Sequence, residues 1–449
     1  MTVRRAIALL GFCFATCALW GCGSEEQPAH PAPPVAPAQP TAPTPPATPA
    51  DLPSGLVLSL AQFVTKDGQS VPGPARLEFL YRSGGSWRTS ALEDPQSNVF
   101  HKAMLYPGDD GPHLLTLGGT AAIVKAWKKN PQVARSEPQA SEDQKGGALE
   151  ATVLWQKDFG GKWSRMRDAE FADLYGDGKR DIAVATHDQG VVAVLRPGAD
   201  GFTAVELDRQ PDTFVHEVEI GDLDRDGKPE VYATPSEPNR LEAGASQAGH
   251  VVRYVPAAGK KREVVADLGE RHAKEILVAD VDGDGTDELY VSVEGDVNEA
   301  NQLVHKVEIR RYDAGTPPTG GAVIATIDDR LTRFLTAGDV DGDGKKELVA
   351  AAFSSGLWLL RPGADAKGSW KVESIDTDSA GFEHASILCD LDGDGTDELY
   401  VASDKHKQVR RYAWDGRKLA REIIYRRPDD RPIFTWNLMP IPRELIPEG

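Results

Sequence analysis

The chain of 449 residues has few cysteines, no excess of basic residues and none of the common enzyme motifs. Its four cysteines exclude a fold held together by a disulfide network. With 50 Lys and Arg against 69 Asp and Glu, the formal net charge of −19 argues against a nucleic-acid-binding protein, which needs a basic face. We find no serine-nucleophile elbow, paired-histidine zinc motif or glycine-rich phosphate loop.

The first 21 residues have the pattern of an export signal. Two arginines precede an apolar run over residues 6–18, which is too short to cross a bilayer as a stable helix. Gly21 and Cys22 follow, and a small residue before a cysteine at this place resembles the lipobox of bacterial lipoproteins. The resemblance implies that Cys22 is lipidated and, because Gly23 rather than Asp follows, that the protein resides at the outer membrane. The alternative is an ordinary signal peptide that leaves Cys22 as a free thiol.

Residues 22–54 are rich in proline, alanine and threonine. Such a segment buries little apolar surface and favours extended conformations, so we expect a disordered tether that holds the folded part away from a membrane. Two cysteines would leave with the signal and Cys22 would carry lipid, so Cys389 would have no disulfide partner. The folded part, residues 55–449, therefore needs another source of rigidity.

One acidic motif recurs along the folded part at intervals of roughly 50 to 60 residues, which indicates a repeat architecture. The motif is Asp-x-Asp-x-Asp-Gly-x-x-Glu, with an apolar or alternating run on either side, and this pattern predicts a β-hairpin with an acidic turn. Two further strand-like runs follow in each repeat, and four short strands per repeat are typical of a propeller blade. The copies begin at Asp173, Asp222, Asp280, Asp339 and Asp390.

The repeats predict seven blades. A degenerate copy over residues 99–127 precedes the five, and its turn at 106–111 lacks most of the carboxylates. Residues 55–92 have strand-like runs without an acidic loop, and residues 433–439 resemble a first strand that no blade follows. We expect these two ends to share one blade, which closes the ring without a free sheet edge. Six blades are the alternative, and residues 128–150 are expected to form a long loop between the first two blades.

The acidic hairpins are similar to FG-GAP or VCBS-type repeats, the units of the integrin α-subunit propeller and of many bacterial surface proteins. The resemblance covers residues 155–425 strongly and 76–127 weakly. It implies an all-β propeller. It identifies a scaffold and not an activity, because one fold carries many functions.

The crowded carboxylates of each loop predict a metal site. They would repel one another unless a cation lay among them, and hard oxygen ligands suit Ca²⁺. The acid at position nine closes the site from the next strand, unlike the closing Glu of an EF-hand at position twelve. We expect four to five structural Ca²⁺ ions that stabilise the fold in place of disulfides. The predicted ligands are Asp173, Asp177, Asp181, Asp222, Asp224, Asp226, Glu230, Asp280, Asp282, Asp284, Glu288, Asp339, Asp341, Asp343, Glu347, Asp390, Asp392, Asp394 and Glu398.

The alternative for each loop is a solvated Asp-Gly turn without a metal. In the first loop Tyr175 replaces a carboxylate, so weaker binding or an empty site stays open there. We expect no ion at the degenerate turn over residues 106–111.

Charged and aromatic residues stand where each first strand begins. Because the metal hairpins of the family lie on one face, these residues are expected to ring the central channel on the other face. Such a ring could bind an anionic or sugar-like ligand or a peptide, and the alternative is a solvated rim of mutually paired charges. The ring consists of His101, Arg167, His216, Lys274, Arg333, His384 and Trp436.

Together these patterns predict a calcium-stabilised lipoprotein of the cell envelope, anchored in the outer membrane and facing the periplasm or the surface. We expect it to act as a binding or interaction module for a protein or polysaccharide, and not to bind nucleic acid. One alternative is a carbohydrate-active enzyme, similar to polysaccharide lyases, that uses the channel ring. Another is a purely structural envelope protein.

Overall fold

The computed structural model describes residues 48–108, 110–130, 148–159, 164–187, 189–199, 201–211, 213–238, 248–428 and 432–447. The chain divides into an N-terminal unit, Met1–Ala42, and a second unit, Pro43–Gly449, that contains all the described residues. The predicted signal, Cys22 and most of the predicted tether lie outside the described residues. None of the helices in the described part has the length and apolar character that crossing a membrane requires.

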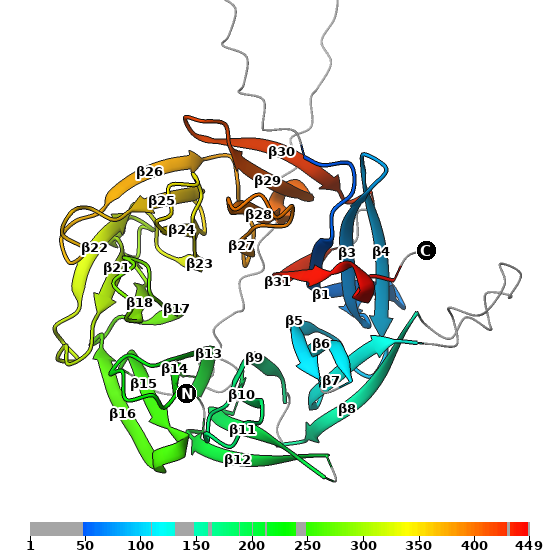
Figure 1. Cartoon of the computed structure of the whole chain (residues 1–449), viewed down its shortest axis with the longest axis horizontal. Helices are drawn as coiled ribbons and strands as arrows, with labels where there is room; N and C mark the ends of the chain where they lie inside the picture. Colours follow the sequence, from blue (N-terminus) through cyan, green and yellow to red (C-terminus); the bar gives the residue numbers. More distant parts are fainter. Residues whose placement is uncertain are drawn as a thin grey trace, which may run out of the picture. The chain divides into compact units, whose positions relative to one another are not determined.

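Seven antiparallel sheets stand side by side around a central axis, so the predicted all-β propeller of seven four-stranded blades is confirmed (Figure 1). In each blade the first strand lies next to the axis and the fourth strand lies at the outside. Helical structure in the described residues is confined to three short 3₁₀ turns, Pro256–Ala258, Asp404–His406 and Arg443–Leu445.

The blades are numbered in chain order, and the strands of each blade follow one another from the axis outward. Blade 1 contains β31 (Ile433–Pro442), β1 (Ser54–Lys66), β3 (Ala75–Ser83) and β4 (Ser86–Asp94), and β2 (Gln69–Pro72) extends β1 as a hairpin. Blade 2 contains β5 (Phe100–Gly108), β6 (Gly111–Gly118), β7 (Ala122–Lys129) and β8 (Leu149–Lys157). Blade 3 contains β9 (Met166–Ala172), β10 (Asp181–Thr186), β11 (Val191–Gly198) and β12 (Gly201–Arg209).

The remaining four blades follow the same order. Blade 4 contains β13 (Thr213–Gly221), β14 (Glu230–Pro238), β15 (His250–Val255) and β16 (Lys260–Asp267). Blade 5 contains β17 (Ala273–Ala279), β18 (Glu288–Val293), β21 (Val307–Tyr312) and β22 (Ala322–Ile327), with an inserted hairpin of β19 (Asp296–Val297) and β20 (Leu303–His305). Blade 6 contains β23 (Thr332–Gly338), β24 (Glu347–Ala352), β25 (Leu357–Arg361) and β26 (Lys371–Asp376). Blade 7 contains β27 (Ser386–Cys389), β28 (Glu398–Ser403), β29 (Gln408–Trp414) and β30 (Leu419–Arg426).

Blade 1 joins the two ends of the propeller, as the sequence predicts. The last strand, β31, pairs antiparallel with β1, and Leu58 lies opposite Leu438 with both side chains fully buried. Arg427 reinforces this closure from blade 7, because its guanidinium donates hydrogen bonds to Glu78 at 3.1 Å and to Asp404 at 2.5 Å. The ring therefore closes by pairing strands from opposite ends of the sequence.

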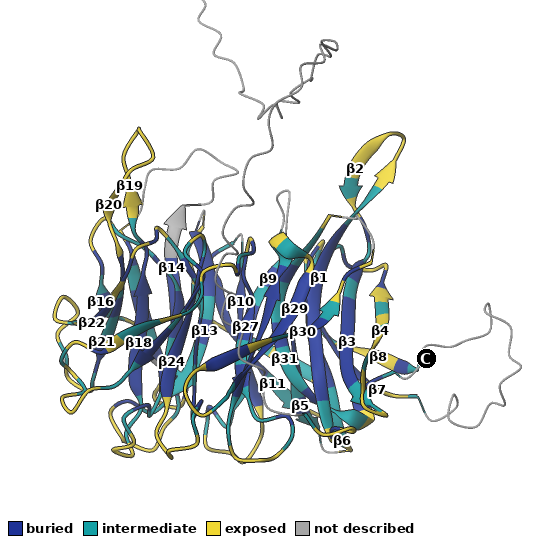
Figure 2. Ribbon diagram, turned by 90° about the horizontal axis from the view of Figure 1, so that it is seen from above, coloured by how far each residue is buried: buried dark blue, intermediate teal, exposed yellow. Residues whose placement is uncertain are grey.

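The hydrophobic core lies between the blades. Each of the seven apolar clusters combines side chains of two neighbouring blades, so the ring as a whole buries the core. The second strands pack on both faces, and all six residues are buried in each of β10, β18, β24 and β28 (Figure 2). This burial explains their nearly continuous apolar sequences, in contrast to the alternation of a half-exposed strand.

One prediction about the connections is wrong. The segment after β7 joins β7 to β8 within blade 2, whereas the sequence predicts a loop between two blades. The fourth strand, β8, was missed because most of its residues are exposed or half-buried, so its sequence has no clear apolar pattern. Residues 131–147 of this segment lie outside the described residues.

Candidate metal loops and channel mouth

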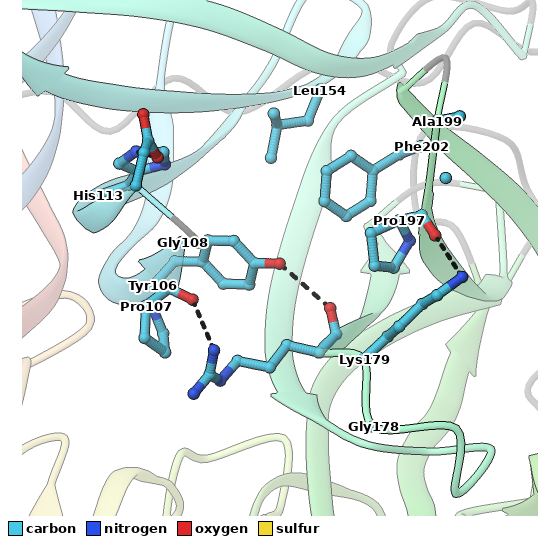
Figure 3. A pocket seen from close by; sticks show the side chains of 13 residues that line it. Tyr106, Pro107, Gly108, His113, Leu154, Gly178, Lys179, Pro197, Ala199 and Phe202 are labelled. Atoms are coloured by element: carbon cyan, nitrogen blue, oxygen red, sulfur yellow. Dashed lines mark hydrogen bonds and ion pairs between the residues drawn. The ribbon is translucent and has the colours of Figure 1, made fainter.

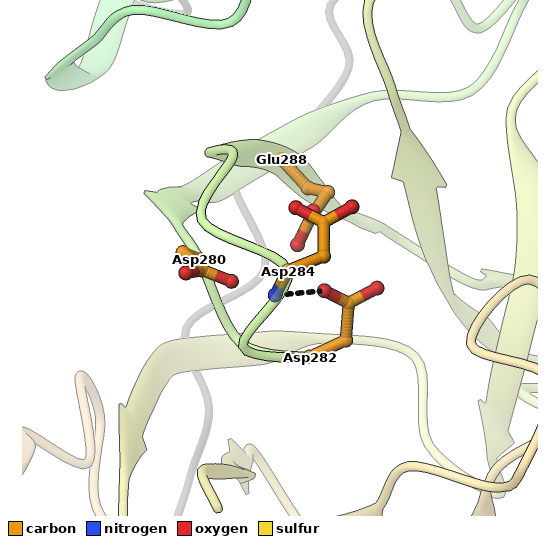
Figure 4. Close-up of side chains that lie close together, drawn as sticks. All are labelled: Asp280, Asp282, Asp284 and Glu288. Carbon is orange, nitrogen blue, oxygen red and sulfur yellow. Dashed lines mark hydrogen bonds between the residues drawn. The ribbon is translucent and has the colours of Figure 1, made fainter.

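The five acidic loops connect the first and second strands of blades 3 to 7. In each loop at least three carboxylates offer oxygen atoms within 4.8 Å of one another, so each group could hold a metal ion. Figure 4 shows the loop of blade 5, where four acids surround one point. The groups are Asp173, Asp177 and Asp181; Asp222, Asp224 and Asp226; Asp280, Asp282, Asp284 and Glu288; Asp339, Asp341 and Glu347; and Asp390, Asp392 and Asp394.

The first aspartate shapes each loop through backbone hydrogen bonds. The carboxylate of Asp280 accepts hydrogen bonds from the backbone N–H groups of Gly283 at 2.8 Å and Gly285 at 2.9 Å. Gly285 has φ +81°, a left-handed conformation that an L side chain rarely adopts, so glycine is needed at this sixth position. The same capping recurs in the other four loops, at Asp173, Asp222, Asp339 and Asp390.

The donor chemistry of the loops fits a hard cation. All the converging groups are carboxylates, and oxygen ligands select ions of this kind. Asp341 and Asp392, at the third position of their loops, each have a buried carboxylate oxygen without a hydrogen-bond partner. A buried acceptor without a partner is costly, and a bound cation would satisfy it.

An arginine on the third strand of each blade pairs with the closing acid, and sequence analysis missed this partner. Arg253 lies 2.6 Å from Glu230, and Arg361 lies 2.7 Å from Glu347 and 2.7 Å from Asp341. The available signal was the recurrence of Leu-Arg-Pro at residues 195–197 and 360–362 and of Arg-Arg-Tyr at residues 310–312 and 410–412. The five pairs are Arg196 with Asp181, Arg253 with Glu230, Arg311 with Glu288, Arg361 with Glu347, and Arg411 with Glu398.

These arginines compensate only part of the loop charge. Burial raises the pKa of Glu288 to about 7, against the opposing effects of Tyr290 and Arg311. In the first loop, Tyr175 stands where the other loops have a carboxylate, and its ring lies 3.8 Å from the Arg196 guanidinium. At the third position of that loop a cation–π contact thus stands in place of an ion pair, although Arg196 still pairs with Asp177 at 2.7 Å. The loop has one oxygen ligand fewer.

The degenerate turn of blade 2 is a tight hairpin between β5 and β6. Asp110 there pairs with His113 at 2.8 Å and Lys128 at 3.3 Å. A cavity of about 590 Å³ lies beside the turn, between blades 2 and 3 (Figure 3). Arg180 crosses it and donates a hydrogen bond to the carbonyl of Pro107 at 3.2 Å, so the cavity is partly bridged by the chain's own contacts.

Loops of neighbouring blades are also bonded to each other. The Asp397 carboxylate of blade 7 accepts a hydrogen bond from the backbone N–H of Asp339 at 2.9 Å, and the Asp397 N–H donates to the Asp339 carbonyl at 2.8 Å. Asp287 of blade 5 bonds the N–H of Asp222 in the same way at 3.1 Å. We call these two contacts the loop latches.

Each loop latch requires a glycine directly before the first loop aspartate. A Cβ on Gly338 would lie 2.6 Å from Asp397 Oδ2, and a Cβ on Gly221 would lie 2.2 Å from Val278 Cγ1 and 3.1 Å from Asp287 Oδ2. In blade 6 the eighth loop residue, which is Asp397 in blade 7, is Lys346. The residue directly before the first loop aspartate of the neighbouring blade 5 is then Ala279 and not glycine. The glycine and the aspartate therefore occur together, one in each of two neighbouring blades.

We expect Gly338→Ala to lower the free energy of unfolding by about 2 kcal/mol, because the new methyl group overpacks the contact with Asp397. Urea unfolding of Gly338→Ala, of Asp397→Ala and of the variant with both substitutions measures the coupling between the two residues. The loss from Gly338→Ala should be smaller in the Asp397→Ala background. Equal losses in both backgrounds would contradict the latch, and Ala279→Gly is the matched control.

At the opposite ends of the first strands, β-bulges lie at the predicted ring positions. Six of the seven first strands have one residue more than their partner strand at this place. A bulge leaves a residue out of the ladder and redirects its side chain. In five of these strands the inserted residue is itself a predicted ring residue, and in β13 the bulge contains the ring residue His216 together with Glu217. The ring residues at the six bulges are His101, Arg167, His216, Lys274, Arg333 and Trp436.

Five predicted ring residues line one cavity of about 610 Å³, which we call the channel mouth. They are Arg167, His216, Lys274, Arg333 and Trp436. Further residues, most of them in connections between strands, were missed by sequence analysis because the connections differ from repeat to repeat. The additions that carry charge or an aromatic ring are Arg165, His187, Phe214, His272, Glu294, Asp296, Arg330, Phe353, Phe382 and Glu383.

Burial and the neighbouring cations keep His216 neutral at the mouth. Burial lowers the pKa of His216 well below its usual value, and Lys274 and Arg167 lower it further. The carbonyl of His216 accepts a hydrogen bond from Arg167 Nε at 3.1 Å. At neutral pH His216 therefore adds no positive charge to the mouth.

Two of the predicted ring residues do not line the mouth. His101 is buried behind the wall, with its ring 4.7 Å from that of Trp436 and 5.8 Å from that of His187, and it contacts the Met166 carbonyl. His384 is fully buried, and its ring nitrogens bond the Ala352 carbonyl and the Ser379 hydroxyl, each at 2.8 Å. From blade 7, the two residues that precede His384, Phe382 and Glu383, line the mouth instead.

His384 should make stability depend on pH. Burial lowers its pKa to about 4, against an unfolded value of about 6.5, so the unfolded state binds the proton first as the pH falls. We expect the stability advantage of the wild type over His384→Gln to shrink by about 1.4 kcal/mol per pH unit between pH 6.5 and 4. Urea unfolding across this range measures it, and parallel pH profiles would contradict the assignment.

The chain has recognisable relatives at the level of repeats and fold. The model of the FG-GAP-like repeat matches residues 173–233 and 339–401. No curated protein matches the chain in sequence. A crystal structure of a protein from Lactobacillus plantarum is similar with a TM-score of 0.52 and 12% identity, over 86% of this chain and 99% of that chain.

Two further solved structures match with lower TM-scores. A putative 6-phosphogluconolactonase from Bacteroides fragilis is 14% identical, over 86% of this chain and 98% of that chain, with a TM-score of 0.49. Sqt1 of Saccharomyces cerevisiae is 10% identical, over 78% of this chain and 80% of that chain, with a TM-score of 0.47. The repeat match, together with the ring of blades, shows that the chain is a seven-bladed β-propeller with FG-GAP-like repeats.

Proposed function

We propose that the protein is a calcium-stabilised binding module of the bacterial cell envelope, anchored by lipid at Cys22, with its ligand at the channel mouth. The observation that carries the proposal is the set of β-bulges at one level of six first strands. Ladder irregularities disrupt pairing, and proteins keep them where they direct side chains to a site. Five of the redirected side chains line a single cavity of about 610 Å³, a size common for ligand pockets.

Calcium is the proposed ion because the loops offer only oxygen ligands in a turn that the backbone already shapes. Ca²⁺ accepts six to eight oxygens in variable geometry, so carboxylates, a loop carbonyl and water can complete its shell. When bound, the ion supplies the positive charge that the crowded carboxylates need. Four ions are expected if the loop with Tyr175 is empty, and five if it is filled.

The envelope location and the lipid anchor are proposed from residues 1–22 alone. Cells grown with an alkyne-labelled palmitate should incorporate the label into the wild-type protein, which should fractionate with the outer membrane. The Cys22→Ser variant should carry no label. Label retained in Cys22→Ser, or wild-type protein recovered only in the soluble fraction, would contradict the anchor.

The enzyme alternative uses the same mouth, so one experiment separates the two functions. Purified, calcium-loaded protein is incubated with a panel of neutral and acidic polysaccharides, and chain cleavage is followed by reducing ends and by absorbance of unsaturated products. The module proposal expects no turnover by the wild type. Turnover that is lost in both Arg167→Ala and His216→Ala would replace the module with a polysaccharide-cleaving enzyme.

A further inference from the structure

We propose that the channel mouth binds a small organic anion, with a carboxylate held by Arg330 and Arg333 and an apolar or aromatic body against Phe382. This inference rests on the proposed function, because it names the ligand class of the same mouth. It goes beyond the predicted ring by assigning the binding to one sector, between blades 5, 6 and 7.

The first observation is the balance of charge at the mouth. Five of its side chains are cations and three are acids. The acids already have partners within the described residues: Glu383 lies 3.6 Å from Arg167, and Glu294 lies 3.5 Å from Lys274. The third acid, Asp296, pairs with the imidazole of an exposed histidine at 3.1 Å.

Arg330 and Arg333 stand apart from these pairs. Among the described residues, neither guanidinium has an ion pair with a carboxylate, and the Nε of Arg333 is buried without a hydrogen-bond partner. Asp329, the buried acid that directly precedes Arg330, accepts hydrogen bonds from the backbone N–H groups of Ser354 and Ser355, both at 2.6 Å. Two cations are therefore left without compensating charge on a protein whose net charge is −19.

Aromatic rings orient the two guanidinium groups. Arg330 lies 4.9 Å from the ring centre of Phe353, and Arg333 lies 5.8 Å from the same ring and 5.3 Å from that of Phe382. Rings that cover the flat face of a guanidinium leave its N–H edge available. That edge matches a planar carboxylate with two parallel hydrogen bonds, which a lysine could not provide.

The rings also supply a surface for the rest of the ligand. Phe382 is 45% exposed, and it packs against Phe434 with ring centres 5.4 Å apart. Phe353 and Phe382 form a wall shared by the mouth and a second cavity of about 460 Å³, which Ile433 and Phe434 also line. A ligand with an anionic group and an apolar body thus finds both environments side by side.

A layer of buried or half-buried acids lies next to the ring residues along the first strands. Asp168, Glu217 and Glu275 each follow a ring residue directly along the first strands. Asp168 accepts a hydrogen bond from the Val218 N–H at 2.9 Å, and Glu275 accepts one from the Leu335 N–H at 3.0 Å, so these carboxylates also tie blade to blade. Asp168 is also paired with Lys102 at 2.8 Å, and burial raises the pKa of Glu275 to about 8, so this layer adds little net charge below the mouth. The acidic composition of the whole protein disfavours long polyanions.

The test compares two ligands that differ in charge but not in shape. Naphthalene-2-carboxylate and the neutral naphthalene-2-carboxamide are titrated into the calcium-loaded protein by calorimetry. We expect the carboxylate to bind at least tenfold more tightly than the carboxamide. Arg333→Gln and Arg330→Gln should each weaken the carboxylate about tenfold, Phe382→Ala should weaken both compounds, and Arg88→Gln on the outer strand β4 should change neither.

The outcomes separate this inference from the proposed function. Equal binding of the two compounds, lost in Phe382→Ala, would overturn the anion while supporting the mouth as the binding surface. Carboxylate binding that survives all the mouth substitutions would lie elsewhere and overturn both. Binding of neither compound to the wild type would overturn the anion–aromatic ligand class. Unchanged melting temperatures of the variants confirm that each is folded.

Discussion

Removal of divalent cations is expected to lower the melting temperature of the propeller by about 8 °C relative to the same protein in 10 mM calcium. Extracellular calcium modules bind with dissociation constants of about 0.5 mM, so each filled loop contributes about 1.8 kcal/mol at this concentration. Four loops then contribute about 7 kcal/mol, which corresponds to this shift for roughly 400 residues. Differential scanning calorimetry with EDTA and with added calcium measures it.

The control must separate a specific ion from screening of like charges. Sodium chloride at matched ionic strength should restore little of the lost stability, since screening acts mainly between exposed charges. Asp392→Asn, which removes a loop ligand with a buried oxygen, should reduce the calcium-dependent shift, whereas Asp110→Asn at the degenerate turn should not. A melting temperature that EDTA leaves unchanged would exclude structural calcium.

Arg427→Met is expected to destabilise the protein by about 3–5 kcal/mol, the usual result of leaving buried charges without their partner. The guanidinium bonds Glu78 of blade 1, Asp404 of blade 7 and the hydroxyl of Thr435, which lies at 2.9 Å. All three partners are buried or nearly so. The substitution would therefore weaken the junction at which the ring closes, and urea unfolding measures the loss.

Neutralising the partners should restore part of that stability. In the triple variant Arg427→Met, Glu78→Gln and Asp404→Asn, no unpaired charge stays buried, so we expect the loss to shrink. Arg421→Met is the matched control, because Arg421 pairs with Asp376 at 3.1 Å but is 42% exposed, and its loss should stay below about 1 kcal/mol. Similar losses for Arg427→Met and Arg421→Met would contradict the closure network.

Much of the fold could be predicted from the sequence because the same strand–acidic turn–strand pattern occurs in five repeats. The loop aspartates fix one turn per blade, and the incomplete patterns at 55–92 and 433–439 together predict the shared blade. The strand β8 escaped because a half-exposed outer strand needs no apolar alternation. Periodicity thus locates the buried strands and says little about the outer ones.

The candidate site was only partly predictable. In blades 3 to 6 the predicted ring residue lies six positions before the first loop aspartate, and counting this constant distance back from the loop reaches the bulge. His384 fails this count because blade 7 has no bulge, and His384 itself has φ +58° just before β27. Arg330 and Phe382 lie in connections outside the repeat, so only the folded ring brings them together.

The pairing of β31 with β1 has a consequence for the order of events in biosynthesis. The partner of the first strand is made last, so an emerging polypeptide leaves blade 1 with an open edge until residues 433–442 have been synthesised. The clusters that blade 1 shares with its two neighbours also contain residues of β31 and cannot be completed earlier. A nascent chain therefore cannot close the ring of blades before its last strand is made. A messenger truncated before codon 433 would yield a product in which β1 has an unpaired edge.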